Sequence, residues 1–487
     1  MAEKETQTFD INKNKNFNDW FNDIVEKAEL ADLRYNVKGF VVFRPWAVRT
    51  INIMYELYEK ELQKRKHEPV IFPAVIPESN FKLEAEHVKG FSPEVFWVTE
   101  HGDNEKLEEK LALRPTSETA MYKMYSLWIR SWRDLPLKLY QRAQVCRYET
   151  KATKAFLRGR EFYWIETHNC FATLKEAENQ VLEDMEISEK IIHKTFGVPF
   201  IFFRRPEWDK FAGAVYTFAC DAYMPSGRMV QLPSTHLLGQ NFSKPFEVKF
   251  KDENEKEQYV YQTCYGPSIS RIFASVFSVH GDDKGLVLPF VLAPVQIIII
   301  PILKTGAEKK ITEKCMAIKK KLEPYFRTEI DDSDKKPGNK FYFWEMKGVP
   351  LRLEIGLNEI TSKELVLFRR DTGKKIKVKE SELKKKIAEQ GAELTKNLFE
   401  KADREFKNTL ASAKNFNELK EKLESGKIVK INFCSREKDG IDCAKLIKEK
   451  LGAEVRGDRA DEKEKPDGNC VICSKKANSV VYIARQY

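Results

Sequence analysis

Residues 114–168 hold the side chains whose types and spacing best suit chemistry. The stretch begins with Arg114-Pro-Thr-Ser-Glu118, continues with Cys146-Arg-Tyr-Glu149, and ends with Arg160-Glu-Phe-Tyr-Trp-Ile-Glu-Thr-His168. A guanidinium binds phosphate oxygens in a fork, a carboxylate accepts hydrogen bonds from an exocyclic amine, and an aromatic ring stacks on a base. The mixture therefore predicts a site for ATP and a small cationic co-substrate.

The chain lacks the glycine-rich motifs that cradle nucleotide phosphates in other folds. Neither G-x-x-x-x-G-K-[ST] nor G-x-G-x-x-G occurs in its 487 residues. An ATP site without such a loop must use arginine side chains. The elements expected around residues 114–168 are mostly strands with interspersed helices, which favours an antiparallel sheet over a doubly wound parallel one.

Several later stretches occur in a characteristic order. They are Phe156-Leu-Arg-Gly-Arg-Glu-Phe162, Leu238-Gly-Gln-Asn-Phe-Ser-Lys244, Lys347-Gly-Val-Pro-Leu-Arg352, and a four-cysteine tail that ends in Tyr487. With the first stretch, they make nearly the whole chain resemble the class II aminoacyl-tRNA synthetases, specifically the prolyl-tRNA synthetases of archaeal and eukaryotic type. The resemblance implies an aminoacyl-tRNA ligase that forms prolyl-adenylate from L-proline and ATP, then transfers proline to the 3′ end of tRNA(Pro).

The resemblance also implies a role for each residue of the nucleotide site. Arg147 and Arg271 would act in catalysis, Arg147 by bridging the α-phosphate and the proline carboxylate. Asp221 would lie near ATP-bound Mg²⁺, although an ordinary aspartate at a strand end is the alternative. The implied ATP-binding set is Arg147, Glu149, Arg158, Phe162, Gln231, Thr235 and Arg271.

Proline carries a secondary ammonium, a carboxylate and an apolar ring, and the resemblance assigns residues to each. Glu118 would pair with the ammonium beside Thr116, and Trp164 would enclose the ring with some cation–π attraction. The implied proline-binding set is Thr116, Glu118, Arg147, Trp164, Glu166, His168 and His236.

Four departures from the family pattern are expected in or beside this pocket. They are Thr167, the order Ser234-Thr235, Cys146, and a loop over 266–271 that is one residue longer. Alanine and cysteine are small enough to enter a proline pocket, and a missing methylene gives only about 1–3 kcal/mol of discrimination. Only about seventy residues separate His168 from His236, too few for the editing insertion of bacterial-type relatives. Editing would then need a separate protein acting in trans.

Two alternatives stay open. A sister class II synthetase such as the threonyl type is one, but its catalytic metal has Cys and His ligands, and residues 147–168 show no such set. A non-catalytic RNA-binding relative is the other, and loss of pyrophosphate exchange with retained tRNA binding would reveal it.

The C-terminal half predicts two further modules. The first is an α/β module, in which the resemblance implies that Glu345, Lys347 and Arg352 read the anticodon, because unstacked bases offer their edges to such groups. In the second, the spacing C-x8-C, 26 residues, C-x2-C suits tetrahedral Zn²⁺, with redox use as the alternative. The zinc ligands would be Cys434, Cys443, Cys470 and Cys473.

The expected fold class is α+β, in three domains. Residues 1–285 would form the catalytic domain, 286–400 the anticodon-binding domain, and 401–487 a small α/β zinc domain. A short strand is expected over 70–77, and the resemblance implies that it pairs two subunits into a homodimer with Pro73 at the interface, with structural punctuation as the alternative. Residues 361–427 are expected to be helical. Further strands are expected at 136–150, 160–171, 200–204, 214–223, 228–232, 327–331 and 351–355, with a helix at 174–196.

Composition fits a cytoplasmic protein with no membrane partner. Hydrophobic residues make up 42% and charged residues 32%, and no run of 18 apolar residues or secretion signal is visible. A net charge of +10 allows a polyanionic partner such as tRNA.

Overall fold

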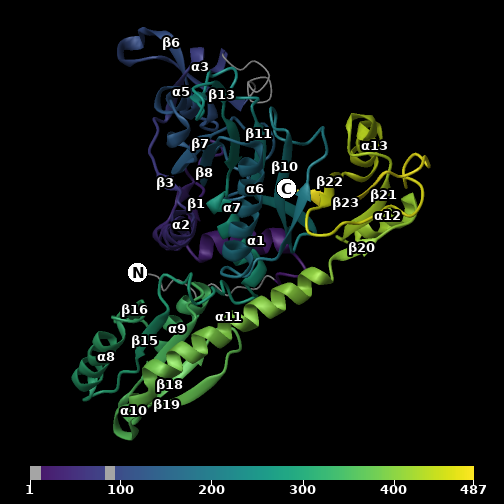
Figure 1. Ribbon diagram of the computed structural model, residues 1–487. Coiled ribbons are helices and arrows are strands. Elements are labelled where there is room, and N and C mark those ends of the chain that lie inside the picture. The colour runs from purple at the N-terminus through teal and green to yellow at the C-terminus, as the bar shows by residue number, and fades with distance from the viewer. Residues whose placement is uncertain (1–11, 83–93) are drawn as a thin grey trace.

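The computed structural model describes residues 12–82 and 94–487. Its main feature is a sheet of eleven strands, in the order β20-β21-β23-β22-β9-β10-β11-β14-β8-β7-β3 (Figure 1). From β21 to β7 every neighbouring pair is antiparallel, which confirms the predicted sheet type.

The catalytic part supplies seven of these strands. They are β3 (Glu68–Pro69), β7 (Leu137–Cys146), β8 (Glu161–Phe171), β9 (Phe200–Arg204), β10 (Tyr216–Met224), β11 (Arg228–Gly239) and β14 (Tyr261–Tyr265). Helix α6 (Leu174–Ser188) contacts β8, β11 and β14, and α7 (Ile269–His280) contacts α2 (Pro45–Lys64) as well as the sheet. The predicted single strand over 70–77 is wrong, because β3 ends at Pro69 and β4 (Val75–Pro77) belongs to a separate small sheet with β5 (Phe96–Glu100) and β6 (Lys106–Leu113).

The second module contains a five-stranded sheet in the order β16-β15-β17-β18-β19. Its elements are β15 (Ile297–Pro301), α8 (Glu308–Leu322), β16 (Thr328–Ile330), α9 (Pro337–Met346), β17 (Leu351–Ile355), α10 (Leu357–Ser362), β18 (Glu364–Arg369) and β19 (Lys375–Lys379). The prediction of helix throughout 361–427 is wrong here. Residues 375–379 alternate lysine with apolar side chains, and Val378 is buried, as in a strand with one buried face.

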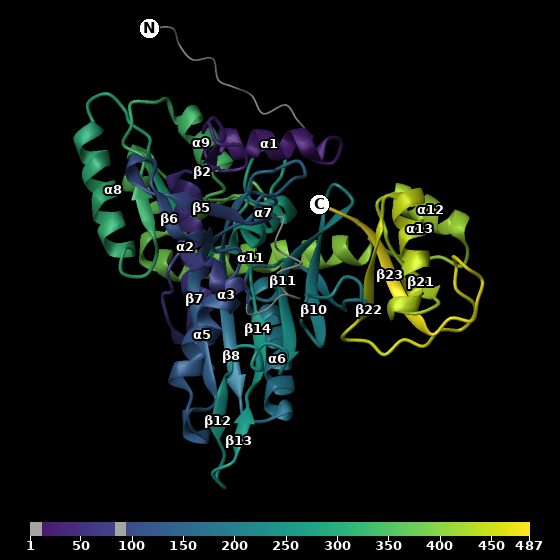
Figure 2. The same ribbon diagram turned by 90° about the horizontal axis from the view of Figure 1, so that it is seen from above.

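Helix α11 (Leu383–Lys407) spans the distance from this module to the C-terminal module, and so crosses the expected boundary at residue 400 (Figures 1 and 2). It contacts the catalytic part on the way. At Gly197 a Cβ would come within 2.1 Å of the Phe399 ring, and φ there is +71°, so only glycine fits.

The C-terminal module continues the catalytic sheet. It contains β20 (Leu410–Ser412), α12 (Phe416–Glu424), β21 (Ile428–Phe433), α13 (Ile441–Leu451), β22 (Glu454–Arg459) and β23 (Ser479–Gln486). Strand β22 pairs with β9, and the end of β23 pairs with β11. Tyr487 then donates to, or accepts from, the hydroxyl of Ser226 at 2.7 Å, so the chain end lies on the catalytic part as the resemblance implies. Within the described ranges, no helix is both long and apolar enough to cross a membrane.

Candidate active site

A cavity of about 230 Å³ lies on one face of the central sheet. Strand β8 contributes Phe162, Trp164, Glu166 and His168 to its lining. Successive side chains of a strand point to opposite faces, so these four residues at alternate positions share one face. The geometry brings together most of the residues that the sequence predicted: Thr116, Glu118, Arg147, Phe162, Trp164, Glu166, His168, Gln231, His236 and Arg271.

One end of the cavity is acidic. Glu118 begins helix α5 (Glu118–Trp128), is 2% exposed, and accepts a hydrogen bond from the Thr116 hydroxyl. Glu166 is 1% exposed and accepts from the Ser117 amide at 3.2 Å and from Gln141 Nε2 at 2.8 Å. Two buried carboxylates this close need positive charge nearby, because an uncompensated buried charge is costly.

His168 supplies part of that charge. Its Nε2 lies 3.1 Å from Glu166 Oε2, and its Nδ1 lies 3.3 Å from the Tyr122 hydroxyl. Burial alone would lower the pKa of His168, but the carboxylates of Glu118 and Glu166 together raise it above its ordinary value. Arg147 also lies near enough to interact with both carboxylates, so the acidic end borders directly on the arginine side of the cavity.

The fold also brings Cys264, on β14, to this end. Ligand atoms of Glu118, His168 and Cys264 lie within 4.8 Å of one another, a grouping that the sequence analysis did not find because Cys264 is far from the motif. A metal would need a thiolate and a neutral imidazole. Burial raises the pKa of the Cys264 thiol well above its ordinary value, and the pKa of His168 is raised too.

The other end of the cavity is positive. Phe162 lies between two guanidinium carbons, 5.2 Å from that of Arg147 and 5.9 Å from that of Arg271. Arg147 Nε donates to the Pro115 carbonyl at 3.0 Å, and Arg271 Nε donates to the Leu157 carbonyl at 2.9 Å, which fixes both side chains. Burial, together with Arg147 and Arg158 nearby, lowers the pKa of Arg271 to about 10. An anion bound here would relieve this repulsion between like charges.

Glu149 and Arg158 lie at the edge, outside the lining of the cavity. Arg158 Nε is 3.7 Å from Glu149 Oε2, and Glu149 Oε1 accepts from the Lys151 amide at 2.8 Å. Arg158 lines a neighbouring hollow beside Lys154 and Tyr487 instead. Both residues belong to the loop between β7 and β8, so a long ligand such as a triphosphate would be needed to reach them from the cavity.

The same alternation of strand side chains places Thr235 and Thr167 outside the cavity, although both were expected in or beside the pocket. Thr235 lies between Ser234 and His236 on β11 and points away from the cavity, where its hydroxyl donates to Asp184 Oδ2 at 2.7 Å. Thr167 lies between Glu166 and His168 on β8, is fully buried, and is likewise outside the lining. The Thr235 and Thr167 side chains therefore lie outside the cavity, and the assignment of Thr235 to ATP binding stays a prediction.

Asp221 is also placed differently from the expectation. It is fully buried on β10, and both its oxygens are engaged: Arg205 donates to them at 2.7 and 3.0 Å, and Arg456 Nε donates at 2.7 Å. The two guanidiniums hold the pKa of Asp221 below its ordinary value in spite of burial. These contacts favour the alternative of a structural aspartate, and the expected position near ATP-bound Mg²⁺ stays a prediction.

Sequence reasoning missed several lining residues that lie outside the motifs. The segment between β9 and β10 carries four of them, and no local pattern marked that segment. The missed residues are Arg205, Asp209, Lys210, Phe211, Thr217, Leu232, Cys264, Tyr265 and Ser268. Two buried donors of the lining, Trp164 Nε1 and Ser268 Oγ, have no hydrogen-bond partner among the described residues.

Comparisons with known proteins agree with this geometry. The family model "tRNA synthetase class II core domain (G, H, P, S and T)" matches residues 96–280, "Anticodon binding domain" matches 296–390, and "Prolyl-tRNA synthetase, C-terminal" matches 416–487. The proline–tRNA ligase of Thermofilum pendens is 50% identical over 99% of both chains, and that of Pyrococcus horikoshii is 40% identical over 97% of this chain and 98% of the other. The chain belongs to the proline–tRNA ligase family.

A solved structure supports membership of this family. It is described as Giardia lamblia prolyl-tRNA synthetase in complex with prolyl-adenylate, and it is 38% identical to this chain. The two superpose with a TM-score of 0.94 over 99% of this chain and 100% of that one. The class II architecture predicted from the motifs is thereby confirmed.

The residues predicted to read the anticodon are engaged inside the protein. Lys347 is 4% exposed, and its Nζ donates to the Ala28 carbonyl at 2.8 Å and to Glu29 at 2.6 Å, which joins the anticodon module to the catalytic part. Arg352 is also 4% exposed; it donates to Glu345 at 2.8 Å and lies 4.0 Å from the rings of Phe341 and Phe368. Lys347 and Arg352 thus have partners within the protein, whereas Glu345 is partly exposed, and the assignment of all three to the anticodon stays a prediction.

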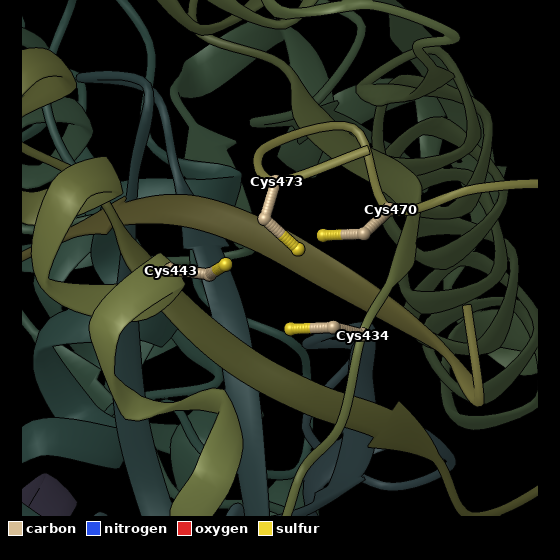
Figure 3. A group of neighbouring side chains, drawn as sticks. All are labelled: Cys434, Cys443, Cys470 and Cys473. Atoms are coloured by element: carbon tan, nitrogen blue, oxygen red, sulfur yellow. The ribbon is translucent and has the colours of Figure 1, made fainter. Parts of the chain in front are cut away.

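The four cysteines of the tail meet as predicted. Cys434 follows β21, Cys443 lies on α13, and Cys470 and Cys473 lie on the loop before β23. Their sulfurs point toward one another and lie within 4.8 Å (Figure 3). Zinc–sulfur bonds of about 2.3 Å in a tetrahedron place sulfurs roughly 3.8 Å apart, so this set of donors fits Zn²⁺.

Proposed function

We propose that the pocket forms prolyl-adenylate from L-proline and ATP, and that the chain then transfers proline to the 3′ end of tRNA(Pro). The observation that carries the proposal is the opposite charge of the two ends of one cavity. The acidic end suits the secondary ammonium of proline, and the arginine end suits the α-phosphate of ATP. The structural neighbour bound to prolyl-adenylate supports the same pair of ligands.

In this reaction the proline carboxylate attacks the α-phosphorus in line, and pyrophosphate leaves. The carboxylate is already ionised, so no protein nucleophile or general base is required. Catalysis then consists of positioning and of neutralising the charge on the phosphate oxygens. Arg147 lies between the two ends, within 5.9 Å of the Trp164 ring and 5.2 Å of the Phe162 ring, and would bridge the proline carboxylate and the α-phosphate.

The remaining substrate contacts follow from position. Glu118 with Thr116 and Glu166 with His168 would hold the ammonium, while Trp164 and His236 enclose the ring. Phe162 and Arg271 would flank the adenine, with Gln231 beside them, and Glu149 and Arg158 would meet the parts of ATP that leave the cavity. Mg²⁺ would enter with ATP as part of the substrate.

The cysteine cluster would hold a structural Zn²⁺. Bound there, the ion would tie the loop before β23 to α13 and to the end of β21. It lies in the C-terminal module, away from the residues that line the cavity, so a stabilising role suits it better than a catalytic one.

A homodimer is supported by the exposed surface around β4. Ile71 is 97% exposed and Val75 is 37% exposed, and both flank the exposed Pro73. Apolar side chains at this exposure suit a partner subunit.

A tRNA substrate would place the activity in the cytoplasm, and a separate protein would edit tRNA mischarged with alanine or cysteine.

The test is ATP–pyrophosphate exchange with proline, alanine, cysteine and threonine supplied separately. Exchange that depends mainly on proline is expected. Exchange with threonine, together with a metal bound at Glu118, His168 and Cys264, would instead identify the threonyl type. Absence of exchange from folded protein that still binds tRNA would mean an RNA-binding relative.

A further inference from the structure

A buried cluster of charges connects the C-terminal module to the pocket. At its centre is Asp221, which accepts from Arg205 on one side and from Arg456 on the other. The three side chains are 0%, 2% and 2% exposed, so their charges are shielded from water. Arg205 follows β9 and Arg456 lies on β22, so the cluster joins two parts of the chain that are 251 residues apart.

The cluster reaches the nucleotide end of the cavity in two further hydrogen bonds. Arg205 Nη2 donates to Gln231 Oε1 at 3.1 Å, and the Gln231 carbonyl accepts from Arg271 Nη1 at 3.3 Å. Arg205, Gln231 and Arg271 all line the cavity. The orientation of Arg205 therefore affects the side chain of Gln231 directly.

On the other side, the C-terminal module holds Arg456 firmly. Arg456 Nη1 donates to Gln486 Oε1 at 2.7 Å, and the Arg456 carbonyl accepts from Arg205 Nη1 at 2.9 Å. The next residue, Gly457, has φ +115°, and a Cβ there would lie 1.9 Å from the Arg204 carbonyl oxygen. The two backbones thus approach as closely as glycine allows, and β22 cannot shift without moving β9.

We propose that Arg456 is a positioning residue for the ATP end of the pocket, through Asp221, Arg205 and Gln231. The proposal rests on the proposed function, since it concerns binding of ATP in that reaction. Arg205 has a second carboxylate within reach, because its Nε lies 3.6 Å from Asp209 Oδ2, and Asp209 also lines the cavity. Arg456 pairs with Asp221 on the side away from Arg205 and neutralises part of its charge. Arg205 is therefore attracted less strongly to Asp221 and can also donate to Gln231. Without Arg456, Asp221 attracts Arg205 more strongly, and the Arg205 guanidinium moves away from Gln231.

The test is Arg456→Gln, measured by exchange at varied ATP and varied proline. We expect the KM for ATP to rise about tenfold or more, the size of losing one hydrogen bond to a charged group, while kcat and the KM for proline change less than about threefold. Arg456→Lys keeps a charge near Asp221 and should recover much of the ATP affinity. Arg459→Gln is the matched control on the same strand, because Arg459 pairs with Asp461 and Glu462 within its own module.

An unpaired buried Asp221 could prevent folding of Arg456→Gln. The double variant Asp221→Asn, Arg456→Gln removes that charge and should fold. Because no charge then draws Arg205 away from Gln231, its KM for ATP should stay within about threefold of that of the unaltered protein. An unchanged KM for ATP in Arg456→Gln would overturn the proposal, and so would equal losses with both substrates or a tenfold rise in the KM for ATP in the double variant. The exchange rate of the unaltered protein is measured first, and an unaltered protein without proline-dependent exchange would refute the proposed function. Normal exchange by the unaltered protein, with no change of the KM for ATP in Arg456→Gln, would refute only the positioning role.

Discussion

The substitution Thr235→Val tests whether Thr235 and Ser234 point to opposite faces of β11. The fully buried Thr235 hydroxyl donates to Asp184 Oδ2 at 2.7 Å, whereas its neighbour Ser234 lines the cavity. Valine has nearly the shape of threonine, so the change removes one hydrogen bond and little packing. We expect a less stable protein with an unchanged KM for ATP.

The size of the loss follows from the charge on Asp184. Burial raises the pKa of Asp184 to about 7, so the carboxyl is mostly neutral at pH 5 and mostly ionised at pH 8. A neutral hydrogen bond contributes about 0.5–1.5 kcal/mol, and one to a charged group about 1.5–3 kcal/mol. Thr235→Val should therefore cost roughly 1 kcal/mol at pH 5 and about 2 kcal/mol at pH 8.

Denaturant unfolding at both pH values measures the loss, and exchange kinetics measure the KM for ATP. Ser234→Ala is the matched control. It removes a hydroxyl that lies 2.9 Å from His236 Nε2 inside the pocket, so it should change the KM for proline and leave stability nearly unaltered. A tenfold rise in the KM for ATP in Thr235→Val, with stability unchanged, would refute the reasoning from strand alternation.

Three further predictions test other parts of the molecule. Glu118→Gln keeps a polar group beside Thr116 but loses the charge, so the KM for proline should rise about 10–100-fold in exchange assays while the KM for ATP stays within about twofold; equal rises would contradict a site for the ammonium. Because the pKa of Asp184 is raised from 3.8 in the unfolded chain to about 7 in the fold, the folded protein binds the extra proton and loses up to about 1.4 kcal/mol of stability per pH unit between these values. Asp184→Asn lacks this slope, so its unfolding free energy relative to the unaltered protein should increase from pH 4 to pH 7, and a constant difference would be contrary evidence. Elemental analysis should find one Zn²⁺ per chain, and its removal by a chelator, or Cys434→Ser, should lower the melting temperature; metal-free protein with the same melting curve would exclude a stabilising zinc.

Residues close in sequence on one strand could be placed correctly from the sequence. The alternate positions Phe162, Trp164, Glu166 and His168 share a face because a strand repeats every two residues. The same rule, applied to β11, would have predicted that the Thr235 side chain points away from the cavity. The hairpin of β18 and β19 was missed because its lysines favoured a solvated helix, although residues 375–379 alternate as a strand does.

The sequence by itself determined the family, the antiparallel catalytic sheet, the motif residues of the pocket and the four cysteines, since motifs and local periodicity carry that information. Only the tertiary structure decided which partners the buried charges have. Asp221 meets Arg456 across 235 residues, Lys347 meets Glu29 across 318, and Cys264 on β14 lies beside Glu118 at the start of α5. A charged side chain that leaves water must find a partner wherever the fold places one, and no local pattern records that choice.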